Sequence, residues 1–575
     1  MLERAGRWSA SRGPGRTPTG HPLVAGTSPA ASSVSAVLHT PRRVRHRFAV
    51  VVTGVAVLGL ALMDLAAPLN ANLRYEAGVK IAGTDTAAGT FSHRPLAYRL
   101  VMDAVFRSAH LLSTGAVTLE LAVRVLLALL ALGAGFLLRQ GLARHRVAQP
   151  GLHAAVAVGG LVMLGLVSAG EPDWLAVVFT LAGVGVALLG DRGRPWLYAT
   201  SAGILFVAAA GMKIVTLPLA IIGLVVTLVV DRRLAGRALV ASLGVGVLYV
   251  IATVLWVPWE IQWLLDLRAV QNGARDGLVD AGPYAVALVA QRPVLAPLPA
   301  AAILAAGRER ALVLGASAVT AGLIVAQGQY FAYHAVPLVV VAAVAVFRVL
   351  RDRLSTVAGA ALLAVVVILA GLSAVDPVWA VDHERLRAGG LAAFALTAVV
   401  WALGVRARPT VRRPGRAAYA ALITLALVVP GATPWSAQLL RAENTDGTRP
   451  PNAFQLRTAR TATAERVHRV IGGPDVDVTY LTSGEWTYWL QNPTRCRYPS
   501  PLFLQRTRKP ARLLTASYRE NVGCLTDPAA RWLIIETAWF IPGRQPADVR
   551  DVLARHWDCQ DATTTGGLRL CPRRV

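Results

Sequence analysis

The sequence has few charged residues, few cysteines and no Walker motif for nucleotide binding. Charged residues make up 16% of the 575 residues, whereas soluble domains average about 25%. Hydrophobic residues make up 55%, and the mean hydropathy is +0.50. Long apolar stretches recur from about residue 48 to about residue 431, too many for one membrane anchor. This composition excludes an ordinary soluble protein and predicts a mainly α-helical, polytopic membrane bundle.

Acidic residues are also scarce: the sequence has 32 Asp and Glu but 58 Lys and Arg, so the formal net charge is +26. In a soluble protein this balance would suggest a nucleic-acid partner. Here the arginines gather in short segments between apolar stretches, which is the pattern that orients helices in a membrane. We therefore expect the lipid bilayer, and no nucleic acid, as a partner.

The apolar stretches predict about 11–13 membrane spans. They lie at residues 48–68, 116–138, 152–169, 173–190, 196–211, 213–230, 236–257, 293–306, 310–326, 329–347, 355–373, 388–405 and 417–431. The basic N-terminus followed by the first stretch could mimic a signal peptide, but the many later spans favour a retained first span.

Every second loop is rich in arginine, in phase with the basic N-terminus. The arginines concerned are Arg139, Arg144, Arg146, Arg192, Arg194, Arg232, Arg233, Arg237, Arg308, Arg310, Arg348, Arg351, Arg353, Arg406, Arg408, Arg412, Arg413 and Arg416. The positive-inside rule places these loops and the N-terminus in the cytoplasm. We expect a multi-pass plasma-membrane protein whose other loops, and everything after about residue 431, lie outside.

The four cysteines, Cys496, Cys524, Cys559 and Cys571, all lie near the C-terminus. An oxidising location outside the cell predicts two disulfides there, and the sequence does not choose among the pairings. A zinc site is the competing interpretation, but it is less favoured because no CxxC pair is present.

Three regions follow from these patterns: a disordered basic cytoplasmic tail (1–47), a transmembrane domain (48–431) and an extracytoplasmic, disulfide-containing α/β domain (432–575). In the third region, DVDVTYLTSG and RWLIIETAW are strand-like, while TATAERVHRVI and PADVRDVLARHW have helical spacing.

The first outer loop, residues 69–115, is long and carries unusual residues. Asp64 ends the preceding span, and Tyr75, His93 and Arg94 follow. From Pro95 onward the apolar residues have helical spacing, with Arg99, Asp103 and Arg107 on another face, so we expect an amphipathic helix lying on the membrane. The apolar residues are Leu96, Leu100, Val101, Val105 and Phe106.

The next two outer segments place charges at the membrane. Glu171 and Asp173 enter a span, where one acid could simply favour the helix dipole, but two acids beside Trp174 favour a function for at least one. Lys213 is a lone cation in an apolar setting. It could reach toward the headgroups, but we favour a phosphate-binding role.

The last two outer segments are aromatic. Trp256, Trp259 and Trp263 suit the headgroup belt of another interfacial helix. On that helix Glu260 is a candidate for function, whereas a solvated face is favoured for Asp266. His334 could be structural, but its polar neighbours favour a binding surface, and these are Gln327, Gln329 and Tyr333.

At these motifs the chain resembles the GT-C superfamily, the integral-membrane glycosyltransferases that use polyprenyl-phosphate-linked sugars. The resemblance covers about residues 48–575 in architecture and rests on Asp64, Tyr75, FSHRPLAYRL, GEPDW, GMKIVTLP and GQYFAYHAVPL. Bacterial members that use polyprenyl-phosphate mannose often carry an aromatic residue followed by Tyr-Pro-Pro, where this chain has His93-Arg94-Pro95. The composition is typical of a high-GC bacterium such as an actinobacterium.

The resemblance implies transfer of a sugar from a polyprenyl-phosphate donor to a cell-envelope glycan or glycolipid acceptor outside the membrane, typically with inversion, in cell-wall biogenesis. Asp64 would act as general base, and Glu171 or Asp173 would orient the acceptor or share that role. Arg94, Lys213 and His334 would neutralise the leaving phosphate, assisted by His93. Tyr75, Gln329, Tyr333 and Glu260 are the expected acceptor- or lipid-binding residues.

This chemistry requires no cofactor and is compatible with a divalent cation between the acids, whose ligands the sequence does not identify. The C-terminal domain would bind the growing glycan or act as a structural cap. Two alternatives are a transporter or flippase for a lipid-linked glycan and a non-catalytic subunit of a cell-wall assembly complex. The charged groups on one face and the absence of a visible inverted repeat disfavour the transporter.

Overall fold

The structure, a computed structural model, describes most of the chain between residues 89 and 574. The described residues are 89–91, 94–112, 116–165, 169–190, 193–272, 282, 284–285, 288–289, 292–328, 332–353, 384–407, 453–499, 504 and 516–574. The predicted tail and the predicted spans at 48–68, 355–373 and 417–431 lie outside these residues.

Most helices of the bundle lie at predicted spans, and Leu96–Leu112 and Glu260–Asn272 are helices where interfacial helices were predicted. The helices are α3 (Leu96–Leu112), α4 (Ala116–Arg144), α5 (Pro150–Gly165), α6 (Pro172–Leu188), α7 (Pro195–Gly211), η1 (Ile214–Thr216), α8 (Leu217–Val230), α9 (Arg232–Trp256), α10 (Glu260–Asn272), η2 (Pro293–Leu295), α12 (Leu298–Leu304), α13 (Gly307–Gln327), η3 (Ala332–Ala335), α14 (Val336–Arg353) and α17 (Glu384–Ala407).

Among the described residues, 3 helices are long and apolar enough to cross a membrane: Thr118–Arg144, Arg232–Trp256 and Gly307–Gln327. Further helices are equally apolar but shorter, and they include α6, α7 and α8 with η1. The predicted positions of these helices are therefore confirmed, while the total number of spans stays a prediction.

Local sequence signals explain where several helices begin and end. Proline occupies the first turn of α6 and α7, where its missing N–H costs nothing. Asp231 caps α9, because its carboxylate accepts hydrogen bonds from the N–H groups of Arg233 and Leu234. Gly328, with φ of 61°, ends α13 in the left-handed conformation.

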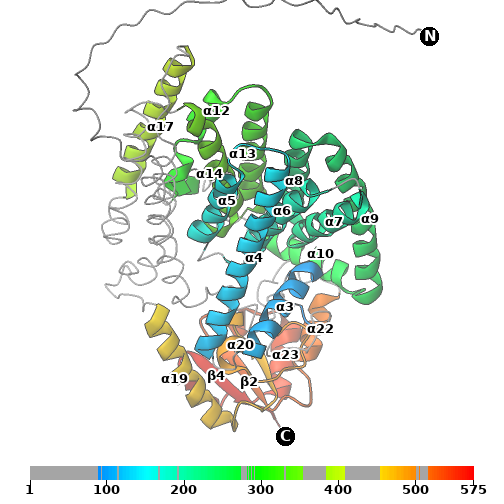
Figure 1. The fold of residues 1–575 in the computed structure, drawn as a ribbon. Helices are drawn as coiled ribbons and strands as arrows, with labels where there is room; N and C mark the ends of the chain where they lie inside the picture. The colour runs from blue at the N-terminus through cyan, green and yellow to red at the C-terminus, as the bar shows by residue number, and fades with distance from the viewer. Residues whose placement is uncertain are drawn as a thin grey trace, which may run out of the picture. The chain divides into compact units, whose positions relative to one another are not determined.

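Helices α4, α6, α7 and α9 pack one against the next (Figure 1). In a lipid bilayer the hydrophobic effect does not drive helices together, so they associate through close van der Waals packing. Small residues at the contact allow the two backbones to approach closely enough for this packing. A Cβ atom on Gly185 of α6 would lie 2.4 Å from the carbonyl carbon of Leu137 on α4. A Cβ atom on Gly141 of α4 would lie 2.6 Å from the Gly185 carbonyl oxygen.

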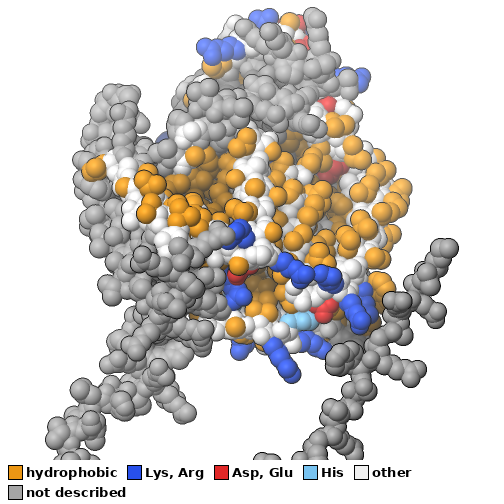
Figure 2. Space-filling view, turned by 90° about the horizontal axis from the view of Figure 1, so that it is seen from above, with side chains coloured by type: hydrophobic (Ala, Val, Ile, Leu, Met, Phe, Trp, Pro, Cys, Tyr) orange, Lys and Arg blue, Asp and Glu red, His pale blue; other side chains and the backbone are white. Residues whose placement is uncertain are grey.

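Figure 2 shows a broad apolar surface on one face of the molecule, with basic side chains mainly along its edge. Helix α9 contributes a long stripe of exposed aliphatic residues to the surface, including Leu243, Leu248 and Leu255. An apolar surface of this extent is expected where helices face lipid. Inside the bundle, buried apolar side chains of α12, α14 and α17 pack together in one core.

The C-terminal region is a small α/β unit, as predicted. Its elements are α19 (Ala453–Ile471), β1 (Val478–Leu481), α20 (Gly484–Leu490), α22 (Ser517–Cys524), β2 (Trp532–Glu536), η5 (Pro542–Arg544), α23 (Ala547–His556), β3 (Thr563–Thr565) and β4 (Leu568–Pro572). The strand order is β1-β2-β4-β3, in which β1 and β2 are parallel and the other pairs are antiparallel. The β3–β4 hairpin turns at Gly566 and Gly567, whose φ values are positive.

The four cysteines form two disulfides, Cys496–Cys524 and Cys559–Cys571, so the predicted disulfides are present. The region also contacts the bundle through Glu120 near the start of α4. The Glu120 carboxylate accepts a hydrogen bond from the Tyr488 hydroxyl at 3.0 Å and pairs with Arg457.

Three expectations drawn from helical faces are wrong. Arg99 was expected on a polar face of α3 but is 2% exposed and pairs with Glu260. Asp266 was expected to be solvated but is 2% exposed and accepts hydrogen bonds from Ser517 at the start of α22. Trp263 was expected among headgroups but is buried. The C-terminal region covers this part of the bundle, which the spacing of a single helix does not reveal.

Candidate active site

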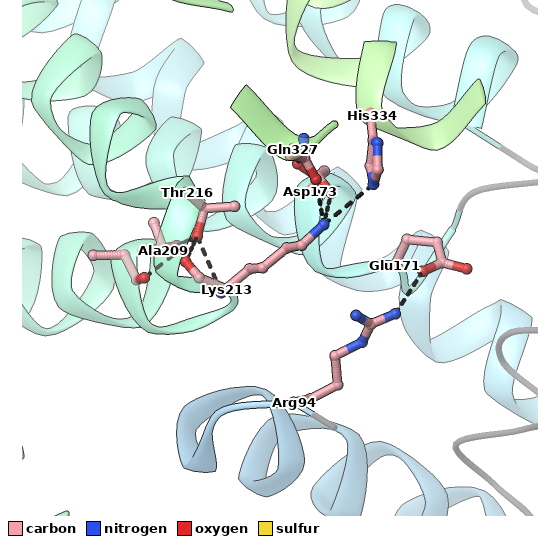
Figure 3. A network of polar contacts seen from close by, with 9 residues as sticks. Arg94, Glu171, Asp173, Ala209, Lys213, Thr216, Gln327 and His334 are labelled. Carbon is pink, nitrogen blue, oxygen red and sulfur yellow. Dashed lines mark hydrogen bonds and ion pairs between the residues drawn. The ribbon is translucent and has the colours of Figure 1, made fainter. Parts of the chain in front are cut away.

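Charged and polar side chains from distant segments converge at the ends of several bundle helices (Figure 3). They are Arg94 before α3, Glu171 and Asp173 at the start of α6, Lys213 between α7 and η1, Gln327 at the end of α13, and His334 in η3. We call these residues the polar cluster. From the sequence we predicted a specific role for every member except Gln327, which was noted only as a polar neighbour of His334.

Lys213 lies at the centre of the polar cluster. Its Nζ atom donates to the Gln327 side-chain oxygen, lies 3.2 Å from His334 Nε2 and lies 3.8 Å from Asp173 Oδ2. Gln327 Nε2 also lies 3.5 Å from Asp173 Oδ1. Because a lysine ammonium can only donate, the contact to His334 is a hydrogen bond if Nε2 accepts, which places the histidine proton on Nδ1.

Arg94 and Glu171 form the other half of the polar cluster. Arg94 Nη2 lies 4.0 Å from Glu171 Oε2, and the two side chains are 9% and 2% exposed. Glu171 occupies the N-cap position of α6, but its side chain makes no capping hydrogen bond. Its carboxylate faces the arginine.

Breaks between helices present these side chains. At Lys213 the backbone is extended, with φ of −160° and ψ of 146°, so α7 cannot run directly into η1. Thr216 stabilises the break: its hydroxyl accepts from the Lys213 N–H at 3.1 Å and lies 2.8 Å from the Ala209 carbonyl oxygen (Figure 3). Because the backbone at Lys213 is extended rather than helical, the side chain can point across the bundle. A lysine within a helix is more restricted in direction.

An aromatic group borders the polar cluster. The Tyr333 ring centroid lies 5.8 Å from Lys213 Nζ and 4.3 Å from the His334 ring centroid. Tyr333 also interacts electrostatically with Arg94, Glu171 and Asp173. Tyr333 is thus placed where it can contact a ligand held by the cations.

Tyr284 and, through it, Arg292 are linked to Asp173, although the sequence did not single out either residue. Tyr284 interacts electrostatically with both Asp173 and Arg292, and Arg292 is buried. Burial lowers the pKa of Arg292 to about 10, so it stays protonated at neutral pH. Arg292 stands immediately before a predicted span, which could have indicated a functional cation. An arginine in that position could equally mark the edge of the membrane.

The remaining candidates divide into two groups. Glu260 contacts Arg99 and the N–H of Leu96 rather than the polar cluster. Burial raises the pKa of the Glu260 carboxyl, and the neighbouring Arg99 guanidinium opposes that shift. The other candidates, Asp64, Tyr75, His93 and Gln329, lie outside the described residues.

Within the described ranges, no group of three His, Cys, Asp or Glu side chains is arranged to hold a metal ion. In the polar cluster the cationic side chains can hold an anion, and the neighbouring carboxylates can accept a proton beside it.

The fold is similar to that of ArnT from Cupriavidus metallidurans in the apo state, with a TM-score of 0.50 and 15% sequence identity. The similarity covers 92% of this chain and 98% of the ArnT chain. ArnT is a GT-C glycosyltransferase that uses a polyprenyl-phosphate sugar. No protein-family model and no curated protein sequence matches the chain. The expected membrane-bundle architecture with a C-terminal mixed-sheet region is confirmed at the level of the fold.

Proposed function

We propose that this chain, a multi-pass membrane protein with the fold of the GT-C glycosyltransferase ArnT, transfers a sugar from a polyprenyl-phosphate-linked donor. The acceptor is a cell-envelope glycan or glycolipid, and the reaction takes place on the outer face of the plasma membrane. The observation that carries the proposal is the polar cluster, in which two cations and two acids alternate at the ends of bundle helices.

Arg94, Lys213 and His334 bind the donor phosphate, with His93 assisting. A phosphate accepts several hydrogen bonds, and charge-assisted bonds from arginine and lysine are among the strongest available. The carboxylates of Glu171 and Asp173 keep the two cations oriented within a largely apolar bundle, where an unpaired charge would be costly.

At the anomeric carbon the reaction forms one bond and breaks one, and one proton moves from the acceptor hydroxyl to a carboxylate. A carboxylate accepts the proton of the acceptor hydroxyl, the oxygen attacks the anomeric carbon, and the bond from that carbon to the phosphate oxygen breaks. The products are the glycoside, with inverted anomeric configuration, and polyprenyl phosphate, whose developing charge the cations neutralise. Asp64 is the proposed base, with Glu171 or Asp173 orienting the acceptor.

Lipid and acceptor binding involve the aromatic side chains near the polar cluster. Tyr333 lies against Lys213 and His334, and Tyr75 and Gln329 are proposed to contribute to the same surface. The positive-inside pattern supports an orientation in which the C-terminal region lies outside, and its two disulfides support the same orientation.

Turnover by the purified protein tests this function. The full chain in proteoliposomes is supplied with synthetic polyprenyl-phosphate pentoses and hexoses and with a glycan acceptor, and released polyprenyl phosphate is measured. We expect release with at least one sugar, and slower release at limiting donor in Lys213→Gln. Failure to release polyprenyl phosphate with every pentose and hexose donor would contradict the enzymatic function.

Asp64→Asn separates the enzyme from the two alternatives. A general base that becomes an amide cannot accept the acceptor proton, so turnover should fall while donor binding persists. A subunit with only an assembly role should tolerate the change, and a flippase should still move lipid-linked glycan between leaflets in vesicles.

A further inference from the structure

A second buried network lies next to Arg94 and uses none of the groups assigned to the reaction. It consists of Arg99 in the first turn of α3 and Glu260 at the start of α10, which form an ion pair between Nη2 and Oε2. Their side chains are 2% and 1% exposed. Burying such a pair carries a desolvation penalty that its attraction often fails to repay, so stability alone is weak grounds for its presence.

The pair bonds to the backbone on both sides of Arg94. Arg99 Nε donates to the Arg94 carbonyl oxygen at 3.1 Å, and Arg99 Nη1 donates to the Thr90 carbonyl oxygen at 2.6 Å. Glu260 Oε1 accepts a hydrogen bond from the Leu96 N–H at 2.6 Å. The guanidinium and the carboxylate together therefore hold the backbone at residues 90, 94 and 96.

The C-terminal region holds the same segment from another side. The Phe91 N–H donates to the Arg497 carbonyl oxygen at 2.7 Å. The Phe91 ring packs edge-on against Trp259, Trp263 and Tyr498, with centroids 5.9, 5.1 and 5.4 Å away. Arg497 in turn lies 4.5 Å above the Trp259 ring. The segment that carries Arg94 is thus held at its backbone by α3, α10 and the C-terminal region.

We propose that the Arg99–Glu260 pair is a positioning element that holds Arg94 toward the donor phosphate. The inference rests on the proposed function, because it gives Arg94 a phosphate to bind. It assigns Glu260 a role different from the acceptor or lipid binding suggested by its sequence context.

The chemistry of the pair supports positioning. A planar guanidinium can donate to two carbonyl oxygens and a carboxylate at once, which a lysine ammonium in the same place cannot reproduce. The Arg94 side chain lies 4.0 Å from Glu171 and also interacts with Tyr333. Both contacts require the backbone at Arg94 to be held where the side chain can reach the polar cluster.

A double-mutant cycle tests whether Glu260 acts through Arg94. The full-length wild type, Arg94→Ala, Glu260→Gln and the double variant are compared in detergent for the Kd of polyprenyl phosphate. We expect Arg94→Ala to weaken binding about 10- to 100-fold, as loss of a charge-assisted hydrogen bond does. Glu260→Gln should weaken it about tenfold, and the double variant should bind within about twofold of Arg94→Ala, because coupled residues are non-additive.

Two controls separate positioning from a general loss of stability. Asp266→Asn removes a buried carboxylate from the same helix as Glu260, where it bonds Ser517. Arg107→Gln removes the ion pair with Asp103 on the same helix as Arg99. We expect both controls to leave the Kd of polyprenyl phosphate unchanged, even where the melting temperature falls. If Glu260→Gln does not fold, Arg99→Lys takes its place in the cycle.

The outcomes distinguish this proposal from the proposed function. If the wild type does not bind polyprenyl phosphate, or if Arg94→Ala binds it normally, the proposed donor site is wrong and the positioning role falls with it. If Arg94→Ala weakens binding but Glu260→Gln does not, or if the two losses add fully, the donor site stands and the positioning role is wrong.

Discussion

At the scale of single residues, Lys213 accounts for the centre of the candidate site. An isolated cation in apolar sequence is expensive in a membrane, so its presence alone predicted a partner or a function. Its partners are Asp173, Gln327 and His334, of which the last two are 114 and 121 residues away in sequence. Each partner was noticeable as a polar residue near a span end, but only the fold brings them together.

Replacing Lys213 with glutamine should weaken binding of the donor. The variant keeps a polar side chain but loses the positive charge, so a charge-assisted hydrogen bond to phosphate worth about 1.5–3 kcal/mol is lost. We expect the KM for the donor to rise about 10- to 100-fold, measured in proteoliposomes with saturating acceptor. The matched control is Arg107→Gln, which removes a cation from the surface of α3. An unchanged donor KM in Lys213→Gln would remove the lysine from the phosphate site.

Arg99 and Asp266 show where reasoning from residues fails. Both follow apolar residues at helical spacing, and both were placed on a face turned away from the core. The spacing of residues along one helix shows only which of them share a face of that helix. Asp266 is buried because its carboxylate bonds Ser517, which lies 251 residues later in the sequence. A polar residue on an apparently solvated face can therefore belong to an interface that the local pattern does not contain.

At the scale of elements, hydropathy located the bundle helices well because each one is a long apolar run that reports its own environment. The breaks were harder to predict, because η1, η2 and η3 are only a few residues long. The β3–β4 hairpin was also missed, because β3 has three residues and is mostly exposed, so no apolar pattern marks it. The breaks matter most for function, since Lys213 and His334 lie in or beside them.

Gly185→Ala should separate α4 from α6. A Cβ atom at this position would lie 2.4 Å from backbone atoms of Leu137, which cannot move aside as a flexible side chain could. We expect a destabilisation of roughly 1–3 kcal/mol, as for other overpacked interiors, seen as a lower melting temperature in detergent. Turnover should fall as well, because α6 carries Glu171 and Asp173.

Gly133→Ala is the matched control for this change. It lies on α4, and a Cβ atom there has no heavy atom within 4 Å. Alanine also favours the helix relative to glycine, so the melting temperature should stay the same or rise slightly. If both alanine variants behave alike, close contact between α4 and α6 is not what holds the acids in place.

At the scale of the whole molecule, the arginine pattern predicts the orientation in the membrane. It places the basic loop at 406–416 in the cytoplasm and the C-terminal α/β region outside. The same assignment explains why all four cysteines lie in one region and form disulfides. The orientation is a prediction that composition alone can make, because charge and oxidation state depend on the compartment rather than on detailed packing.

Cysteine labelling in intact cells tests the orientation. All four native cysteines are paired, so an introduced thiol is the only reactive one. Thr410→Cys should react with a membrane-impermeant maleimide only after the cells are permeabilised. Asp551→Cys, at an exposed position on α23, should react in intact cells. Reversed reactivity of the two variants would invert the assigned topology.

The proposed function depends on the polar cluster binding the phosphate of a lipid-linked donor. The most direct measurement is an electron cryomicroscopy structure of the full-length protein with bound polyprenyl phosphate. We predict phosphate oxygens at about 2.7–3.2 Å, the range of hydrogen bonds, from Arg94, Lys213 and His334. A phosphate bound elsewhere, with the cluster unchanged and without contact to the lipid, would contradict the account.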